Sequence, residues 1–261
     1  MAYLRYKGMI NYAKLMTQAA MLRSQLGEDS CSPLDIFALA QAIERLTIVY
    51  RPMGNNLSGM CIKGQDGDDV IAINSSMSLG RQRFSMAHEF YHLKYDKNMI
   101  SICGKQLDTG KEIERSADMF ASYFLMPQAA LLALADNLSS QYPKQKLELH
   151  DVIRIEQFYG MSHQATVYRL LSAGYLGQSE ANEMLNIIVG QTAERLGYSS
   201  DLYKPSPETK KYVTYGHHIK QIEEVHEQGL ISTGKYEELM LQAFRADLVY
   251  GLEDEGDVVL D

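Results

Sequence analysis

The chain has 261 residues, 46% of them hydrophobic and 22% charged, which is a composition typical of a folded soluble protein and not of a disordered one. Its formal net charge of −8 argues against general binding to nucleic acid or to an anionic membrane, because both need an excess of Lys and Arg. No apolar run approaches the roughly 18 residues of a membrane span, and the N-terminus lacks the features of a secretory signal. We therefore expect a cytoplasmic protein without a membrane segment.

The three cysteines are too few and too scattered for a disulfide framework, which fits a reducing compartment. Any of the thiols of Cys31, Cys61 and Cys103 could bind a metal ion and block its free coordination position. Because free cysteines are among the most buried residue types, packing in the core is the use that we expect of each.

The first part of the chain reads as two helices followed by a small sheet. Apolar residues recur at helical spacing over 9–26, and Ser32-Pro33-Leu34-Asp35 resembles a capping box, with Ser32 as the N-cap, that opens a second helix. The runs 47–50, 57–62 and 70–73 are short, apolar or β-branched, and are separated by Gly, Pro and Asn. The expected fold class is α+β, mostly helical with a small antiparallel sheet, and residues 1–136 are expected to form its core.

Residues 81–96, RQRFSMAHEFYHLKYD, contain no Gly or Pro and carry a His-Glu-x-x-His pentad. On a helix His88 and His92 lie one turn apart on the same face, so both imidazoles can reach one metal ion. Glu89 projects about 100° round the helix from His88, where it can contact a bound water without being a ligand. This arrangement suits metal-assisted hydrolysis. The alternative is an amphipathic helix with two half-buried histidines.

A catalytic zinc bound by two imidazoles needs one more protein ligand and leaves its fourth position to water. The helix expected over 111–126 offers Glu114 and Asp118, four residues apart on one face. We predict Glu114 as the third ligand and Asp118 as the acceptor for the free N–H of a ligand imidazole. Glu112 and Asp108 are alternative ligands, since sequence alone fixes helix register poorly. Residues 98–110, between the two helices, are expected to form a strand or loop near the metal.

Two blocks, RFSMAHEFYH at 83–92 and EIERSADMFASYFLMP at 112–127, resemble the ImmA/IrrE family of bacterial metallopeptidases. In that family a helical His-Glu-x-x-His is followed by a Glu-x-x-Ala-Asn/Asp-x-Phe-Ala helix that ends in Leu-Met-Pro or similar. The order of Glu and Asp also resembles the gluzincin arrangement known from thermolysin. The resemblance, which covers about residues 10–180, implies a zincin-like core with one zinc per chain. It further implies an endopeptidase that cleaves a helix-turn-helix repressor and so relieves repression of mobile-element or stress genes.

In such an enzyme Glu89 would be the general base, which takes a proton from water and passes it to the departing amine. A donor to the developing oxyanion is also expected, with Tyr91, Tyr123, His150 and His163 as candidates. Two other functions stay open: a DNA- or partner-binding regulator, and an antitoxin-like protein that uses a non-catalytic metal site. A purely structural zinc has no need of Glu89, which favours the enzyme.

The polar stretch NLSSQYPKQK marks a boundary after a further helix that follows Pro127. Residues 147–176 then read as helix, turn, helix, with Gly160 as the cap of the first and Ser162 as the N-cap of the second. DNA binding would place in a major groove the side chains of Ser162, His163, Gln164, Thr166, Tyr168 and Arg169. The unit has only Arg154 and Arg169 as nearby cations, which favours a packing role. Residues 182–250 are predicted to be a helical appendage, and 251–261 an acidic tail.

Overall fold

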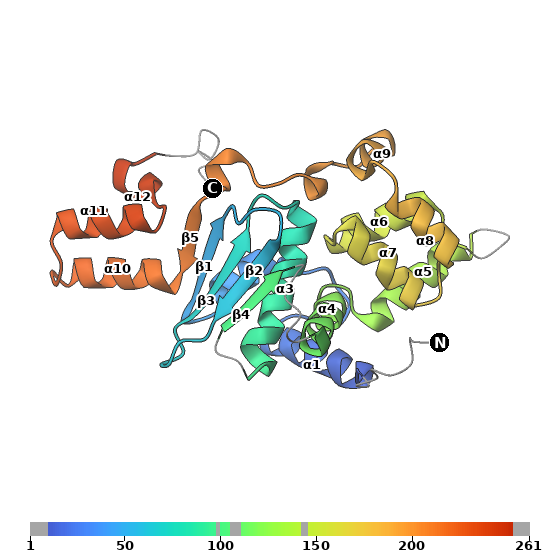
Figure 1. Cartoon of the computed structure of the whole chain (residues 1–261), viewed down its shortest axis with the longest axis horizontal. Helices are drawn as coiled ribbons and strands as arrows, with labels where there is room; N and C mark the ends of the chain where they lie inside the picture. Colours follow the sequence, from blue (N-terminus) through green and yellow to red (C-terminus); the bar gives the residue numbers. More distant parts are fainter. Residues whose placement is uncertain (1–9, 98–99, 105–110, 142–145, 253–261) are drawn as a thin grey trace.

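The computed structural model describes residues 10–97, 100–104, 111–141 and 146–252, and it confirms an α+β fold around one sheet (Figure 1). The strands are β1 (Leu46–Arg51), β2 (Leu57–Ile62), β3 (Asp69–Asn74), β4 (Ile100–Gly104) and β5 (Val213–Gly216). The helices before the boundary are α1 (Tyr12–Gln25), α2 (Ile36–Ala42), α3 (Leu79–Tyr95), α4 (Lys111–Leu125) and α5 (Gln128–Ser139). The later ones are α6 (Leu149–Tyr159), α7 (His163–Ser172), α8 (Gln178–Leu185), α9 (Val189–Arg195), α10 (His217–Glu227), α11 (Thr233–Gln242) and α12 (Ala246–Tyr250).

The sheet is mixed, with the strand order β4-β2-β3-β1-β5. β1 and β3 run parallel, which corrects the expectation of an antiparallel sheet, whereas the other pairs are antiparallel. The reason lies in the loop from β1 to β2, which crosses the end of β3 at the fully buried Asn74. The amide group of Asn74 donates hydrogen bonds to the carbonyls of Gly54 and Leu57, and its oxygen accepts one from the N–H of Met53. These hydrogen bonds fix the loop between β1 and β2 across the end of β3, so that β3 lies between β1 and β2 in the sheet.

β5 is a further departure from expectation, because it lies within the segment 182–250 that was predicted to be helical. It pairs antiparallel with β1, with Tyr50 opposite Val213, and so completes the sheet on one side. The strand ends at Gly216, whose φ is +87° and where a Cβ would lie 2.2 Å from the carbonyl oxygen of Leu46. Four residues are too few to give a periodic signal, which explains why the sequence does not predict this strand.

Helices α2 and α3 pack on one face of the sheet, α4 packs against α3, and α1 packs against α4. Arg23 on α1 is buried and donates hydrogen bonds to the carbonyls of Asp29, Ser32 and Phe124, so that it ties α1 to α4 and to the loop before α2. The N-cap of α2 is Asp35 and not the predicted Ser32: the Asp35 carboxylate accepts from two amides of the first turn. Residues 36–42 therefore form a shorter helix than the capping-box reading implies.

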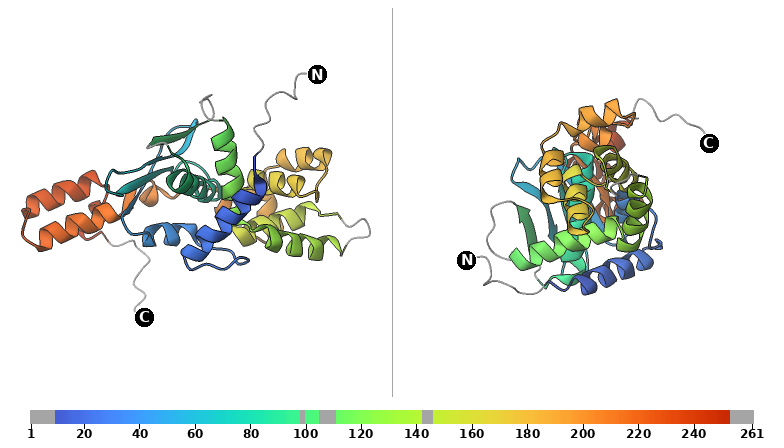
Figure 2. Two further views of the ribbon diagram at one scale, coloured as in Figure 1. Left: turned by 90° about the horizontal axis from the view of Figure 1, so that it is seen from below. Right: turned by 90° about the vertical axis from the view of Figure 1, so that its right-hand side faces the viewer.

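Helices α6 and α7 form the predicted helix-turn-helix, with Gly160 in the left-handed conformation at the end of α6 and Ser162 capping α7. Both belong to the same hydrophobic core as α3 and α4, through Val152, Ile155 and Val167. The helices α10 and α11 project from the other end of the sheet, as both Figure 1 and the left view of Figure 2 show. They have a small core of their own.

Within the described residues no single helix is long and apolar enough to cross a membrane. Among the described helices, one bent pair, α4 and α5 at 63°, reaches the length and composition of a span when taken together. Of the predicted acidic tail, 253–261 lies outside the described residues.

Candidate metal centre

Helix α3 carries both histidines of the pentad beneath the sheet, where their side chains are almost completely buried. The Nε2 atoms of His88 and His92 lie 3.1 Å apart, so the two imidazoles converge on one point. A helix presents residues four apart on one face, and this spacing accounts for the convergence. The sequence-predicted pair is therefore brought together.

Glu114 approaches this point from α4. Its two carboxylate oxygens lie 3.3 Å from Nε2 of His88 and 3.4 Å from Nε2 of His92. Ligand atoms bound at about 2.0–2.2 Å to one tetrahedral zinc are separated from each other by roughly 3.3–3.6 Å. The spacing of these three side chains therefore fits a common divalent ion. The alternative ligand Glu112 is exposed, and Asp108 lies outside the described residues.

A second carboxylate stands behind each histidine. Oδ1 of Asp118, on α4, lies 2.9 Å from Nδ1 of His88. Oδ2 of Asp96 lies 3.0 Å from Nδ1 of His92. Sequence reasoning missed Asp96, although its position four residues after His92 at the end of α3 is the signal that could have found it. Each imidazole can thus donate from Nδ1 to a carboxylate and keep Nε2 free for a metal.

Cys103 is the fourth member of the cluster and was expected to be a packing residue. Strand β4 carries it, and its sulfur and the ligand atoms of His88, His92 and Glu114 all lie within 4.8 Å of one another. Cys61 is buried as expected, whereas Cys31 is exposed, which corrects the expectation for that thiol. The cluster is therefore made of two imidazoles, one carboxylate and one thiol.

Glu89 is fully buried beside the cluster, and neither of its carboxylate oxygens has a hydrogen-bond partner among the described residues. Burial raises the pKa of this carboxyl, although His88, the thiols of Cys61 and Cys103, and His92 act in the opposite direction. A buried carboxylate without a partner is costly unless a bound group satisfies it. Its presence is a second indication that the site is built for an ion and a water.

Gly59 on β2 makes room for this carboxylate. A Cβ on Gly59 would lie 2.8 Å from Oε1 of Glu89 and 3.2 Å from the carbonyl oxygen of Ala72. Gly59 also pairs directly with Cys103 of β4. The sheet therefore leaves room for Glu89 at Gly59, which has no side chain. On the neighbouring strand, opposite Gly59, it places the thiol of Cys103.

The candidate ligand side chains shift one another's pKa values. Burial lowers the pKa of His92, but its contacts with Cys103 and Glu114 outweigh this effect and raise the pKa to about 10. Burial opposes ionisation of Glu114 as well, yet the contacts with His88 and His92 lower its pKa to about 2. The pKa of His88 is raised in the same way, by Asp118, Cys103 and Glu114 acting against burial. A metal ion would displace the protons that the ligand nitrogens carry.

The four candidates for an oxyanion donor are not grouped at the cluster. Tyr123 lies under the guanidinium of Arg169, His150 is half exposed beside Asp151, and His163 is buried against Glu156. Tyr91 lies nearest to the site in the chain, with its ring centroid 6.0 Å from that of His92. Its neighbours also include the rings of Tyr95 and Phe120.

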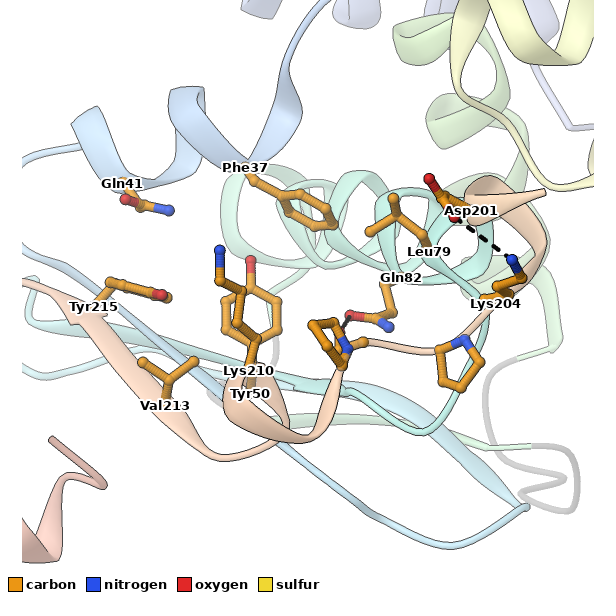
Figure 3. Close-up of a pocket in the computed structure, with 13 residues that line it drawn as sticks. Phe37, Gln41, Tyr50, Leu79, Gln82, Asp201, Lys204, Lys210, Val213 and Tyr215 are labelled. Atoms are coloured by element: carbon orange, nitrogen blue, oxygen red, sulfur yellow. Dashed lines mark hydrogen bonds and ion pairs between the residues drawn. The ribbon is translucent and has the colours of Figure 1, made fainter. Parts of the chain in front are cut away.

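A cavity of about 240 Å³ lies next to the cluster, between α3, α4 and α7. Asp118 is the member of the site that lines it, together with Arg81, Phe84, Met119, Ser122, Gln164, Ala165, Tyr168, Arg169 and Ser172. A larger cavity of about 690 Å³ lies elsewhere, between α2, the sheet and the segment 201–215 (Figure 3). The larger cavity contains none of the site residues, whereas the smaller one reaches the site at Asp118, the carboxylate that contacts His88.

Comparison with protein-family models matches residues 45–171 to Peptidase_M78, the IrrE N-terminal-like domain. The matched range contains β1–β4, α3, α4 and the whole cluster with Glu89. No curated protein matches the chain. The family match supports a metallopeptidase, and therefore a hydrolase.

Proposed function

We propose, on the premise that residues 45–171 form an IrrE N-terminal-like domain, that the chain is a zinc-dependent endopeptidase. His88, His92 and Glu114 would hold one zinc ion per chain. The observation that carries the proposal is the convergence of these three side chains within 3.4 Å of each other, beside a buried carboxylate that is not one of them. Two imidazoles and one carboxylate form a ligand set that suits zinc.

When bound, zinc polarises a carbonyl group and lowers the pKa of water. The chain's own residues supply the remaining chemistry. Glu89, for which Gly59 leaves room, accepts the proton of the attacking water and transfers it to the departing amine. A raised pKa, the result of burial, suits a group that must both accept and release a proton near neutral pH.

Asp118 and Asp96 act as positioning residues. Each accepts the Nδ1 proton of a histidine, at 2.9 Å and 3.0 Å respectively, and thereby fixes the tautomer that leaves Nε2 unprotonated for the metal. The Asp96 side chain is buried and that of Asp118 is half exposed. Because solvent reaches the Asp118 side chain, its contact with His88 must keep this carboxylate in place for the proposed role.

We further propose that the substrate is a protein, and that it is a helix-turn-helix repressor whose cleavage relieves repression in the cytoplasm. Two features support a polypeptide substrate. β4 lies at the edge of the sheet beside the cluster, where an extended segment can add as a further strand. The cavity between α3, α4 and α7 is lined by Phe84, Met119 and Tyr168, and it can accept an apolar side chain of that segment.

A regulator that reads DNA through α6 and α7 has weaker support. His163, Thr166 and Arg169, three of the side chains that such a role would place in a groove, are buried in this chain. His163 contacts Glu156 and the carbonyl of Met184, and Arg169 contacts Gln128. These contacts favour a role in packing for the helix pair.

Metal analysis and a cleavage assay together test the proposal. The purified protein should hold one zinc per chain, His88→Ala and Glu114→Ala should lose it, and the matched control Glu112→Ala should keep it. Glu89→Gln should also retain zinc, while cleavage of a helix-turn-helix repressor substrate falls roughly 10²- to 10⁴-fold. Full metal content in His88→Ala, or cleavage by Glu89→Gln at the wild-type rate, would overturn the assignment.

A further inference from the structure

We propose that Cys103 is a fourth, inhibitory ligand, so that the folded chain is a latent peptidase whose metal is closed by sulfur from β4. This inference rests on the proposed function, because it concerns the same metal. A catalytic zinc site keeps one position open for water or substrate, whereas a structural site has four protein ligands. The chain carries a catalytic motif, yet four potential ligands converge on one point.

The register of the sheet aims the thiol at the metal. Cys103 pairs with Gly59, and successive side chains of a strand alternate between the two faces of a sheet. Cys103 therefore points to the same side as the empty position of Gly59, which is the side that faces Glu89 and α3. Cys103 is 3% exposed, and its neighbour Ser101 is also buried. The thiol thus lies inside the site, away from solvent.

The second observation is what surrounds Glu89. This carboxylate is fully buried, and it lies on the face of the sheet toward which the register of β4 directs the side chain of Cys103. The thiols of Cys103 and Cys61 are its neighbours. Sulfur occupying the fourth position would leave the base without a water to act on, which is what a latent site requires.

The strand that carries Cys103 is placed so that it can leave. β4 is the edge strand and pairs with β2 alone in the described part of the sheet. Its pairing shifts register between Leu57 and Gly59, next to Cys103, and the hydroxyl of Ser58 donates to the Cys103 carbonyl at 3.3 Å. A displacement of this end of β4 would withdraw the sulfur without disturbing α3 or α4, which hold the other three ligands.

Cobalt substitution reads the sulfur ligand directly. The full-length protein loaded with Co²⁺ should show a thiolate-to-cobalt charge-transfer band in the near ultraviolet, and Cys103→Ser should lose this band while it keeps cobalt. Cys61→Ser, a change at the neighbouring buried thiol, and Cys31→Ser, at the exposed one, should both retain the band. X-ray absorption of the wild-type zinc protein, which needs no variant, should show one sulfur at about 2.3 Å.

An activity measurement adds the inhibitory part of the proposal. If the closed state holds about 90% or more of the chains, Cys103→Ala should raise cleavage of the repressor roughly tenfold or more, since more chains are then competent. Wild-type protein that binds one metal without sulfur overturns this inference and leaves the proposed function intact. Wild-type protein that binds no metal overturns both. A sulfur ligand with unchanged or lower activity in Cys103→Ala would contradict the inhibitory role.

Discussion

At the scale of single residues, the candidate centre is defined as much by the groups behind the ligands as by the ligands. His88 and His92 each have one nitrogen at the cluster and the other on a carboxylate. Rotation of the His88 ring about its bond to Cβ would break the contact with Asp118, and the same rotation of the His92 ring would break the contact with Asp96. The carboxylates therefore hold the imidazoles in one orientation before a metal arrives, which reduces the ordering that binding must produce.

Removal of either supporting carboxylate should weaken the metal site. We expect Asp96→Ala and Asp118→Ala each to lower zinc affinity by roughly 10- to 100-fold, since the histidines lose the acceptor that fixes their tautomer. Competition with a chelator measures the affinity. Asp136→Ala, on α5, is the control, because its carboxylate contacts Tyr175 and no residue of the cluster. Wild-type affinity in both variants would mean that these carboxylates do not support the ligands.

Gly59 is the second prediction at this scale. Gly59→Ala places a methyl group 2.8 Å from Oε1 of Glu89, so the carboxylate must move, and we expect the variant to lose roughly 1–3 kcal/mol of stability and most of its activity. Urea unfolding measures the stability. In a Glu89→Ala background the same substitution should cost less, because the clashing atom is gone. Equal costs in the two backgrounds would show that the clash with Glu89 is not the cause.

The residues found from sequence are those whose partners lie a fixed distance away on one helix. His88, Glu89 and His92 follow from helical spacing, and the pair Glu114 and Asp118 from the same rule on the next helix. Cys103 and Gly59 could not be found in this way, because what brings them to the site is the register between two strands. No local pattern fixes that register when the strands are short and separated by a whole helix.

At the scale of elements, the junction of α6 and α7 is held by a buried ion pair. Nδ1 of His163 lies 2.8 Å from Oε2 of Glu156, while its Nε2 lies 2.9 Å from the carbonyl oxygen of Met184. The hydroxyl of Tyr203 donates to the other oxygen of Glu156, from the segment that leads on to β5. One histidine therefore joins the two helices to α8, and one glutamate joins them to the following segment.

This pair predicts a pH dependence of stability. Burial lowers the pKa of His163, but the contact with Glu156 outweighs it, and the net effect is a pKa above the usual 6.5. A histidine with a raised folded-state pKa stabilises the fold fully below the unfolded pKa, and this contribution is lost as pH rises through the folded pKa. Wild type should therefore have a higher free energy of unfolding than His163→Gln. The difference should be largest below pH 6.5, where we expect roughly 3–5 kcal/mol.

The difference between wild type and His163→Gln should shrink as pH rises above that value. Urea unfolding of the two proteins at several pH values measures this difference. A difference that grows with pH would mean that His163 is neutral in the folded chain. The helices themselves follow from apolar spacing and capping residues such as Ser162, whereas this pairing could not be predicted, since it depends on how α7 is set against α6.

At the scale of the whole molecule, the sheet links two cores of different size. The large core extends from α1 to β5, and the small one joins α10 to α11 through Ile219, Ile222 and Met240. Composition and periodicity predict the α+β class and most helices, but not the return of the chain to the sheet at β5. That return depends on a long-range pairing, and its short strand lies between polar residues, so the segment reads as part of a helical region.

The position of β5 gives the last prediction. A chain truncated after Gly216 keeps the strand and loses the small core, whereas one truncated after Tyr212 also loses Val213, which is buried in the large core, and Tyr215, whose ring packs on Tyr50. The shorter chain should be less stable than the longer one by at least about 2 kcal/mol, the value of burying one large apolar side chain. It should also associate, since the edge of β1 is then unpaired. Urea unfolding and light scattering compare the two. Equal stability of the two truncated chains would show that the large core does not end at β5.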